Sequence, residues 1–285
     1  MNKQKKGSFS LSTFLLIMML IAGLSLLLYP TISDWWNSKH QSQAVATYAE
    51  FVQELDEDAY EKLWEEAVAF NKKLNQFPQG MALPKDMEKA YNKALAVDNS
   101  GIMGSVEIPA IKVSLPIYHG TSDDVLQVAI GHLEWTNLPT GGEGNHTVIS
   151  GHRGLPSAKL FTHIDQLREG DVFMLRVLDE VLTYEIDQIL IVEPDKIKPL
   201  YRVKGKDYCT LMTCTPYGVN SHRLMLRGHR IENLNNADLA RIHSDAMQIE
   251  PMVVATIIAI PLLLIAVIIL LWPKKKRKEE TLWLK

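Results

Sequence analysis

Two long apolar segments without charged residues, one near each end of the chain, constrain its architecture more than any other sequence feature. They cover residues 9–29 and 252–272. Each has about the 20 residues that a helix needs to cross the hydrocarbon core of a bilayer. Each also ends in an aromatic residue, a type that favours the headgroup region. We therefore predict two transmembrane helices, with one extended region of the chain between them.

Basic residues flank both segments on the sides that face the chain ends. Three lysines precede the first segment, and a basic run follows the second: Lys3, Lys5, Lys6 and then Lys274, Lys275, Lys276, Arg277 and Lys278. Short basic flanks stay on the cytoplasmic side of a membrane. We therefore expect cytoplasmic tails at residues 1–8 and 273–285, with the region between the spans outside the cell.

A cleaved signal peptide is the alternative for the first segment, with a small-residue site at Ala44, Val45 and Ala46. The apolar run is longer than a usual signal-peptide core, and this site lies well beyond its end. An uncleaved anchor is therefore the favoured interpretation. The net charge of −3 gives no indication of nucleic-acid binding, and a basic run beside a membrane span is explained by topology.

Residues 30–100 have a helical pattern. Residues 46–75 contain no proline or glycine and carry apolar residues at helical spacing, which predicts one helix. Residues 76–84 contain two prolines and a glycine and predict a loop. Residues 86–96 predict a second helix. We expect this region to be a stalk packed against the domain that follows.

The pattern changes at Gly101, where short runs rich in β-branched residues begin. Strands are predicted at residues 106–108, 111–115, 147–150, 172–178, 181–192, 208–213 and 224–229, short helices at 123–130 and 158–166, and a tight turn at Asp179 and Glu180. About 130 residues suffice for one β-barrel core. The sequence therefore predicts a mainly β domain at residues 101–233, followed by a juxtamembrane helix at 234–251.

The chain has two cysteines, Cys209 and Cys214. A disulfide between them would have to fold back within one predicted strand, which the geometry of the bond disfavours. Cys214 ends that strand and is followed closely by Pro216 and Gly218. Arg223 begins the next predicted strand, so a hairpin would bring it back beside Cys214.

These residue types suit acyl-transfer chemistry. A cysteine nucleophile needs a base or a cation nearby, and a guanidinium can donate to the oxygen of a tetrahedral intermediate. His152 follows the predicted strand 147–150 and lies between glycines, so it is the best-placed candidate base. Taken alone, each residue has a structural alternative: a buried small cysteine, or a surface histidine.

The motifs together resemble those of the sortase family. The similar segments are Thr210-Leu211-Met212-Thr213-Cys214, Arg223 within Asn220-Ser221-His222-Arg223-Leu224, Ser150-Gly151-His152-Arg153-Gly154, and Gly104-Ser105-Val106-Glu107-Ile108-Pro109. The resemblance covers residues 102–231 in family order. It is greatest for class C, the pilin-polymerising sortases, on three features: the Cys214–Gly218 motif, the Ser150–Leu155 motif with its Pro156, and the second span with a basic tail.

The resemblance implies a sortase-type eight-stranded β-barrel with short helices, preceded by a helical stalk and flanked by two transmembrane helices. It implies a cysteine transpeptidase in which Cys214 attacks an LPxTG-like sorting signal, His152 moves the proton and Arg223 stabilises the oxyanion. A lysine amine of a pilin subunit would then resolve the thioester, in pilus assembly at the plasma membrane of a Gram-positive bacterium. Thr213 and Thr215 flank the nucleophile and are candidates for contacts with the sorting signal.

One feature departs from class C. Enzymes of that class often carry an Asp-Pro-aromatic lid, and no Asp-Pro pair precedes the barrel here. The segment Asn75-Gln76-Phe77-Pro78 is a candidate for a degenerate counterpart.

Several alternatives remain open from the sequence. They are a housekeeping sortase that attaches proteins to the cell wall, a thiol hydrolase, and a non-catalytic assembly module. A zinc set of His132, His146, His152 and Cys214 matches no common spacing, and the acidic residues form no calcium-loop pattern. We therefore expect neither a metal nor a cofactor.

Overall fold

The computed structural model describes residues 11–234, 261, 262 and 265. The chain divides into two compact units, Ile32–Met247 and the combination of Met1–Thr31 with Gln248–Lys285. Both predicted cytoplasmic tails lie outside the described residues. So do the predicted juxtamembrane helix and the predicted second span, apart from residues 234, 261, 262 and 265.

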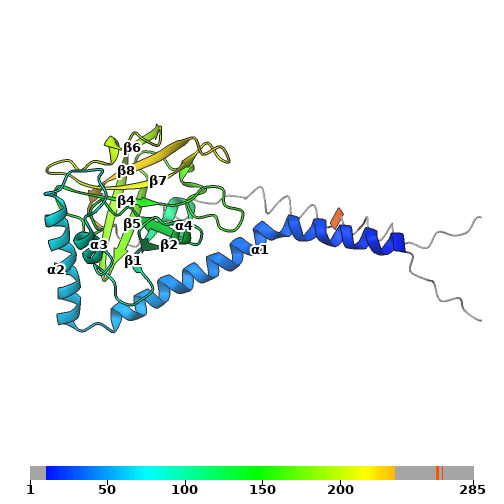
Figure 1. The fold of residues 1–285 in the computed structure, drawn as a ribbon, viewed down its shortest axis with the longest axis horizontal. Coiled ribbons are helices and arrows are strands. Elements are labelled where there is room, and N and C mark those ends of the chain that lie inside the picture. Colours follow the sequence, from blue (N-terminus) through cyan, green and yellow to red (C-terminus); the bar gives the residue numbers. More distant parts are fainter. Residues whose placement is uncertain (1–10, 235–260, 263–264, 266–285) are drawn as a thin grey trace, which may run out of the picture. The chain divides into compact units, whose positions relative to one another are not determined.

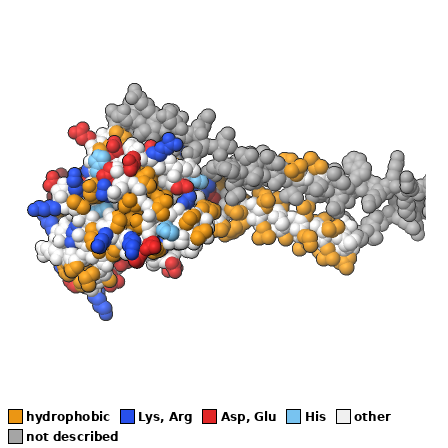
Figure 2. Space-filling view, turned by 90° about the horizontal axis from the view of Figure 1, so that it is seen from above, with side chains coloured by type: hydrophobic (Ala, Val, Ile, Leu, Met, Phe, Trp, Pro, Cys, Tyr) orange, Lys and Arg blue, Asp and Glu red, His pale blue; other side chains and the backbone are white. Residues whose placement is uncertain are grey.

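Helix α1 (Leu11–Gln53) contains the described part of the first predicted span and continues beyond it. Among the described residues it is the one helix long and apolar enough to cross a membrane, by length and composition. Its first half exposes many large apolar side chains, among them Leu11, Phe14, Met19 and Leu26, and Figure 2 shows hydrophobic side chains covering this part of the helix. α1 is therefore a candidate membrane anchor.

The prediction of one helix over residues 46–75 is wrong, because α1 ends at Gln53 and α2 (Glu57–Leu74) begins a new helix. Asp56 is the reason for the break. Its side chain accepts a hydrogen bond from Ala59 N at 2.7 Å and so caps the first turn of α2. The acidic Glu57 and Asp58 in that turn add a favourable interaction with the helix dipole. The third helix, α3 (Lys85–Tyr91), is shorter than predicted.

The predicted eight-stranded barrel is confirmed (Figure 1). Its strands are β1 (Ile102–Ile108), β2 (Val113–His119), β3 (Ile130–His132), β4 (Asn145–Ser150), β5 (Val172–Val177), β6 (Glu180–Val192), β7 (Asp207–Thr215) and β8 (His222–Ile231). They close in the order β1-β2-β3-β4-β7-β8-β6-β5. The pairs β2–β3 and β4–β7 are parallel and the others are antiparallel.

Short elements account for the remaining differences from the predictions. β3 has only three residues, too few to produce an alternating pattern, and was not predicted. The predicted helix 158–166 is a loop that ends in the 3-10 turn η2 (Ile164–Gln166). The hairpin turn lies one residue earlier than predicted, at Leu178 and Asp179, because Val177 pairs with Glu180 and Leu178 adopts a φ of 51°. Three further short helices are α4 (Asp123–Leu126), η1 (Pro109–Ile111) and η3 (Lys198–Leu200).

The helices that precede the barrel share its hydrophobic core. Tyr48 of α1, Phe70 of α2 and Tyr91 of α3 are buried in the same cluster as the inward-facing strand residues. Tyr48 is also bonded to the barrel: its hydroxyl donates to Met103 O at 3.2 Å and accepts from Leu178 N at 2.9 Å. The second half of α1, together with α2 and α3, is therefore packed into the same compact unit as the barrel.

The loop after α2 lies at one end of the barrel. Asn75 Nδ2 donates to Asn145 Oδ1 at 3.1 Å, and Asn145 begins β4 opposite Asp207, the first residue of β7. Cys214 stands near the other end of β7, roughly 23 Å away at about 3.3 Å per residue. The candidate lid at residues 75–78 therefore does not cover the thiol in this structure.

Two buried histidines should make the stability of the fold depend on pH. Burial lowers the pKa of His132 and of His146 from 6.5 to about 4 in each case. Between about pH 4 and pH 6.5, both histidines are therefore protonated in the unfolded chain and neutral in the folded chain. The free energy of unfolding should fall as the pH drops from about 6.5 to about 4, by up to about 3 kcal/mol per histidine.

Urea unfolding at about pH 7 and about pH 4.5 measures this effect. The comparison is between the wild type, His146→Asn, which removes one buried histidine, and His40→Asn, which removes an exposed one. His146→Asn should flatten the pH dependence and His40→Asn should leave it unchanged. Equal urea midpoints of the wild type at the two pH values would contradict the prediction.

Candidate active site

The two cysteines of β7 face opposite sides of the barrel wall. Cys209 is fully buried in the core with Leu211, and burial raises the pKa of its thiol well above the ordinary value. Cys214 is half-buried. The two residues are an odd number of positions apart, so alternation along the strand puts Cys214 on the outer face. Cys214 is therefore the accessible thiol.

The predicted hairpin between β7 and β8 brings Arg223 next to Cys214. These two residues are direct partners in the antiparallel ladder. The Arg223 guanidinium donates to the carbonyl oxygens of His222 and Asn220 at 3.2 and 3.3 Å. A fixed positive charge is thereby held at the strand end that carries the thiol.

His152 follows β4 at the same end of the barrel. β4 pairs in parallel with β7, and Ser150 is the partner of Met212. The contact continues past the strand, because Gly151 N donates to Met212 O at 3.1 Å. Since His152 and Cys214 lie two residues beyond these partners, the register brings His152 to the end of β7. The His152 side chain is half-buried.

An apolar patch adjoins these residues on the outer face. Its members lie on four neighbouring strands and nearby loops: Val148, Leu190, Val192, Met212, Met225, Leu133, Trp135 and Leu200. Met212 lies two residues before Cys214 and pairs with Met225, so both face the same side as the thiol. Val148, Leu200 and Met225 are buried within the patch, and its other members are partly exposed, so only part of this apolar patch faces solvent near Cys214.

The two threonines beside Cys214 form hydrogen bonds within the protein. Thr213 is buried, and its hydroxyl donates to Gly151 O at 2.7 Å, which ties the end of β4 to β7. Thr215 is also buried and accepts a hydrogen bond from Arg153 Nη1 at 3.2 Å. Contact of either threonine with a sorting signal stays a prediction.

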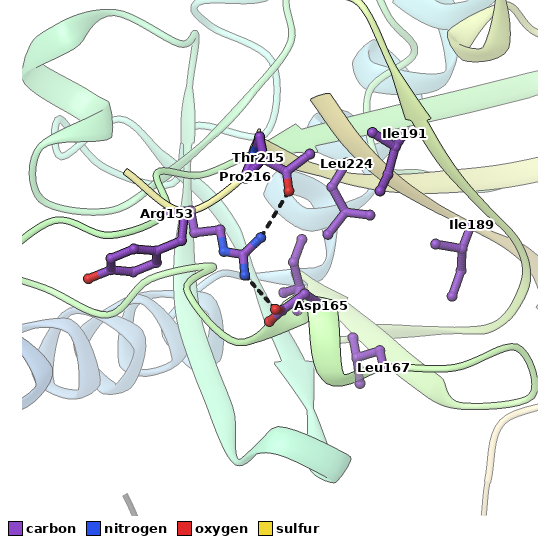
Figure 3. A pocket seen from close by; sticks show the side chains of 10 residues that line it. Arg153, Asp165, Leu167, Ile189, Ile191, Thr215, Pro216 and Leu224 are labelled. Carbon is purple, nitrogen blue, oxygen red and sulfur yellow. Dashed lines mark hydrogen bonds and ion pairs between the residues drawn. The ribbon is translucent and has the colours of Figure 1, made fainter. Parts of the chain in front are cut away.

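Thr215 also lines a cavity of about 350 Å³ that sequence reasoning did not identify. Arg153 reaches into it between Thr215 and Asp165, with Leu224, Ile191 and Ile189 beyond them (Figure 3). The cavity is assembled from segments far apart in sequence, so only the position of Arg153 beside His152 could have drawn attention to it.

The described residues contain no group of three or more His, Cys, Asp or Glu side chains that could hold a metal ion. That the protein needs neither a metal nor a cofactor stays a prediction. The chemistry that the site supports is that of a thiol, an imidazole and a guanidinium brought to one end of the barrel.

Comparison with known proteins bears on this arrangement. The sequence model of the sortase domain family matches residues 106–231 of this chain. Sortase D of Bacillus subtilis (strain 168) is 32% identical over 148 residues, which cover 50% of this chain and 72% of that protein. The chain belongs to the sortase family.

Solved structures relate this sortase to class C. Sortase C1 from Streptococcus agalactiae is 47% identical with a TM-score of 0.66, and the match covers 67% of this chain and 100% of that one. Streptococcus pneumoniae sortase C is 43% identical with a TM-score of 0.60, over 67% of this chain and 97% of that one. Clostridium perfringens sortase C, solved with its C-terminal cell wall sorting motif, is 39% identical with a TM-score of 0.60, over 67% of this chain and 100% of that one.

The predicted family and enzyme class are therefore confirmed. Sortases are cysteine transpeptidases, and this sortase has their closed eight-stranded barrel. Its N-terminal apolar helix is a candidate membrane anchor.

Proposed function

We propose that this sortase joins an LPxTG-like sorting signal of a secreted pilin to a lysine amine of another pilin subunit. Cys214 is the nucleophile, His152 the proton carrier and Arg223 the oxyanion donor. The observation that carries the proposal is the pairing of Cys214 with Arg223, next to the strand end that leads to His152. The similarity to class C sortases from two streptococci supports the choice of a pilin substrate.

In the first step His152 takes the proton of the Cys214 thiol, and the sulfur attacks the threonine carbonyl carbon of the signal. The oxygen becomes negative and accepts hydrogen bonds from Arg223. The C–N bond to glycine then breaks as His152 returns the proton to the leaving amine. A thioester of Cys214 remains.

In the second step the lysine amine attacks the thioester carbonyl and gives its proton to His152. The C–S bond breaks, an isopeptide bond forms, and Cys214 regains its proton. The partly exposed members of the apolar patch near Cys214 suit the leucine and proline of the signal, because contact with them removes apolar surface from water.

The proposed setting is the plasma membrane of a Gram-positive bacterium. The two apolar segments of the sequence would both span the bilayer, with both termini in the cytoplasm and the barrel outside. Secreted substrates then meet the active site on the outer side.

Incubation of the full-length protein, held in detergent, with an LPxTG-like peptide and a lysine-bearing pilin domain tests the reaction. Mass spectrometry should detect an isopeptide-linked conjugate whose yield rises with the pilin domain. A matched acceptor with its lysine replaced by arginine should give none. Hydrolysed peptide alone, under saturating acceptor, would favour a thiol hydrolase and overturn the proposal. Conjugation only to a glycine amine would favour a cell-wall-attaching enzyme.

A further inference from the structure

Arg153, the residue after His152, connects the loop that follows β4 to the end of β7. Its Nη1 donates to Thr215 Oγ1 at 3.2 Å, and Thr215 is the neighbour of Cys214 in the chain. Its Nη2 forms an ion pair with Asp165, at the far end of the same loop. Figure 3 shows the guanidinium between these two partners. One side chain thus joins the segments that carry the proposed base and nucleophile.

The Arg153 side chain is 11% exposed, so its charge is largely withdrawn from water. Its Nε is buried and has no hydrogen-bond partner among the described residues. A buried charge costs free energy that a hydrophobic side chain of similar size avoids. Barrel stability alone therefore does not explain an arginine at this position. The ability of a guanidinium to donate to two partners at once, here Thr215 and Asp165, does explain it.

The rest of the loop is fixed by its own contacts. Phe161 N donates to His152 O at 3.1 Å, and Gly154 N donates to Thr162 Oγ1 at 3.2 Å. Asn37 of α1 donates to Ser157 O at 2.8 Å. These bonds give the loop a definite shape. Arg153 adds a connection from this loop to Thr215, the residue next to the nucleophile.

We propose that Arg153 is a positioning residue that sets the placement of His152 relative to Cys214. This inference rests on the proposed function for its effect on turnover. The geometry also predicts an effect on the free enzyme, because the environment of the Cys214 thiol depends on the position of the imidazole.

The first test needs no substrate. The rate of Cys214 alkylation by iodoacetamide is measured against pH in the full-length protein, where Cys209 is fully buried and protected. The variants are Arg153→Met, which removes the guanidinium, and Arg153→Lys, which keeps the charge but lacks the planar fork that reaches two separate partners. Arg176→Met is the matched control, because it removes another arginine that is paired with a carboxylate. Arg176 of β5 donates through Nε and Nη2 to the Glu107 carboxylate of β1 at 2.7 and 3.2 Å.

Both Arg153 variants should move the midpoint of the alkylation profile by about 0.5 pH unit or more, while Arg176→Met keeps the wild-type profile. A profile unchanged in Arg153→Met would overturn the proposal, even if its thermal stability falls. A wild-type profile in Arg153→Lys would also overturn it, because charge alone would then be sufficient.

The second test uses the proposed reaction. Arg153→Met should lower kcat for peptide cleavage by about 10-fold to 100-fold with little change in KM, as expected for a displaced proton carrier. Thr215→Val should have a smaller effect, and the double variant should lose less than the product of the two single losses. Independent, multiplicative losses would count against the connection through Thr215. If no peptide is cleaved by the wild type, the proposed function fails, while the alkylation profiles still decide the role of Arg153.

Discussion

Replacement of Cys214 by alanine is expected to reduce transpeptidation by roughly 10³-fold or more, because the reaction loses its nucleophile outright. The thermal stability of the variant should stay close to that of the wild type, since Cys214 is half-buried on the outer face. The measurement is the rate of peptide cleavage, together with mass spectrometry for a thioester-linked enzyme. No acylated protein should form.

Cys209 provides the matched control for this experiment. It lies on the same strand but is fully buried in the core. Cys209→Ala should keep the cleavage rate and lose about 1 kcal/mol of stability through a small cavity. Retained turnover in Cys214→Ala would refute the assignment of the nucleophile, whatever the behaviour of Cys209→Ala.

Replacement of Arg223 by alanine is expected to lower kcat by about 10²-fold to 10³-fold, the usual loss for one oxyanion donor. KM should change little, because the oxygen becomes fully negative only along the reaction path. Arg223→Lys should recover part of the loss, since an ammonium keeps the charge but lacks the planar fork. Steady-state kinetics with a sorting-signal peptide measures both quantities.

Arg227, four residues further along β8, is the control arginine. It forms a two-point ion pair with Asp187 at 2.9 and 3.0 Å and lies over the ring of Tyr208 at 4.3 Å. Arg227→Ala should therefore reduce stability and leave kcat unchanged. An Arg223→Ala variant with raised KM and normal kcat would show that Arg223 binds the substrate in its ground state instead.

The positions of the three candidate residues were predictable because each stands at the end of a strong β pattern. The runs before Cys214 and before His152 are rich in β-branched residues, and the turn residues after them mark where the strands end. The pairing partner of Cys214 followed from the length of the hairpin. The eight-stranded barrel was implied by the family resemblance, whereas the strand order was not predicted, because sequence pattern alone does not say that β4 lies beside β7.

The elements that were missed depend on local or long-range contacts. The helix break before α2 was missed because the helical pattern of the sequence is continuous there, and one capping side chain, Asp56, ends it. β3 is too short to show alternation and exists through its pairing with β2 and β4. The contacts of Arg153 leave no signal in the sequence, because Asp165 and Thr215 approach it only in the folded barrel.

The opposite orientations of Cys209 and Cys214 also determine what happens to the enzyme when its accessible thiol is oxidised. The two are the only cysteines in the chain, and five residues of strand separate them by roughly 16 Å, beyond the 7 Å limit for a disulfide. A Cys214 thiol oxidised to sulfenic acid therefore has no resolving cysteine within its own fold. Recovery must come from a thiol supplied by another molecule, and without one a second equivalent of oxidant converts the sulfenic acid to the irreversible sulfinic acid.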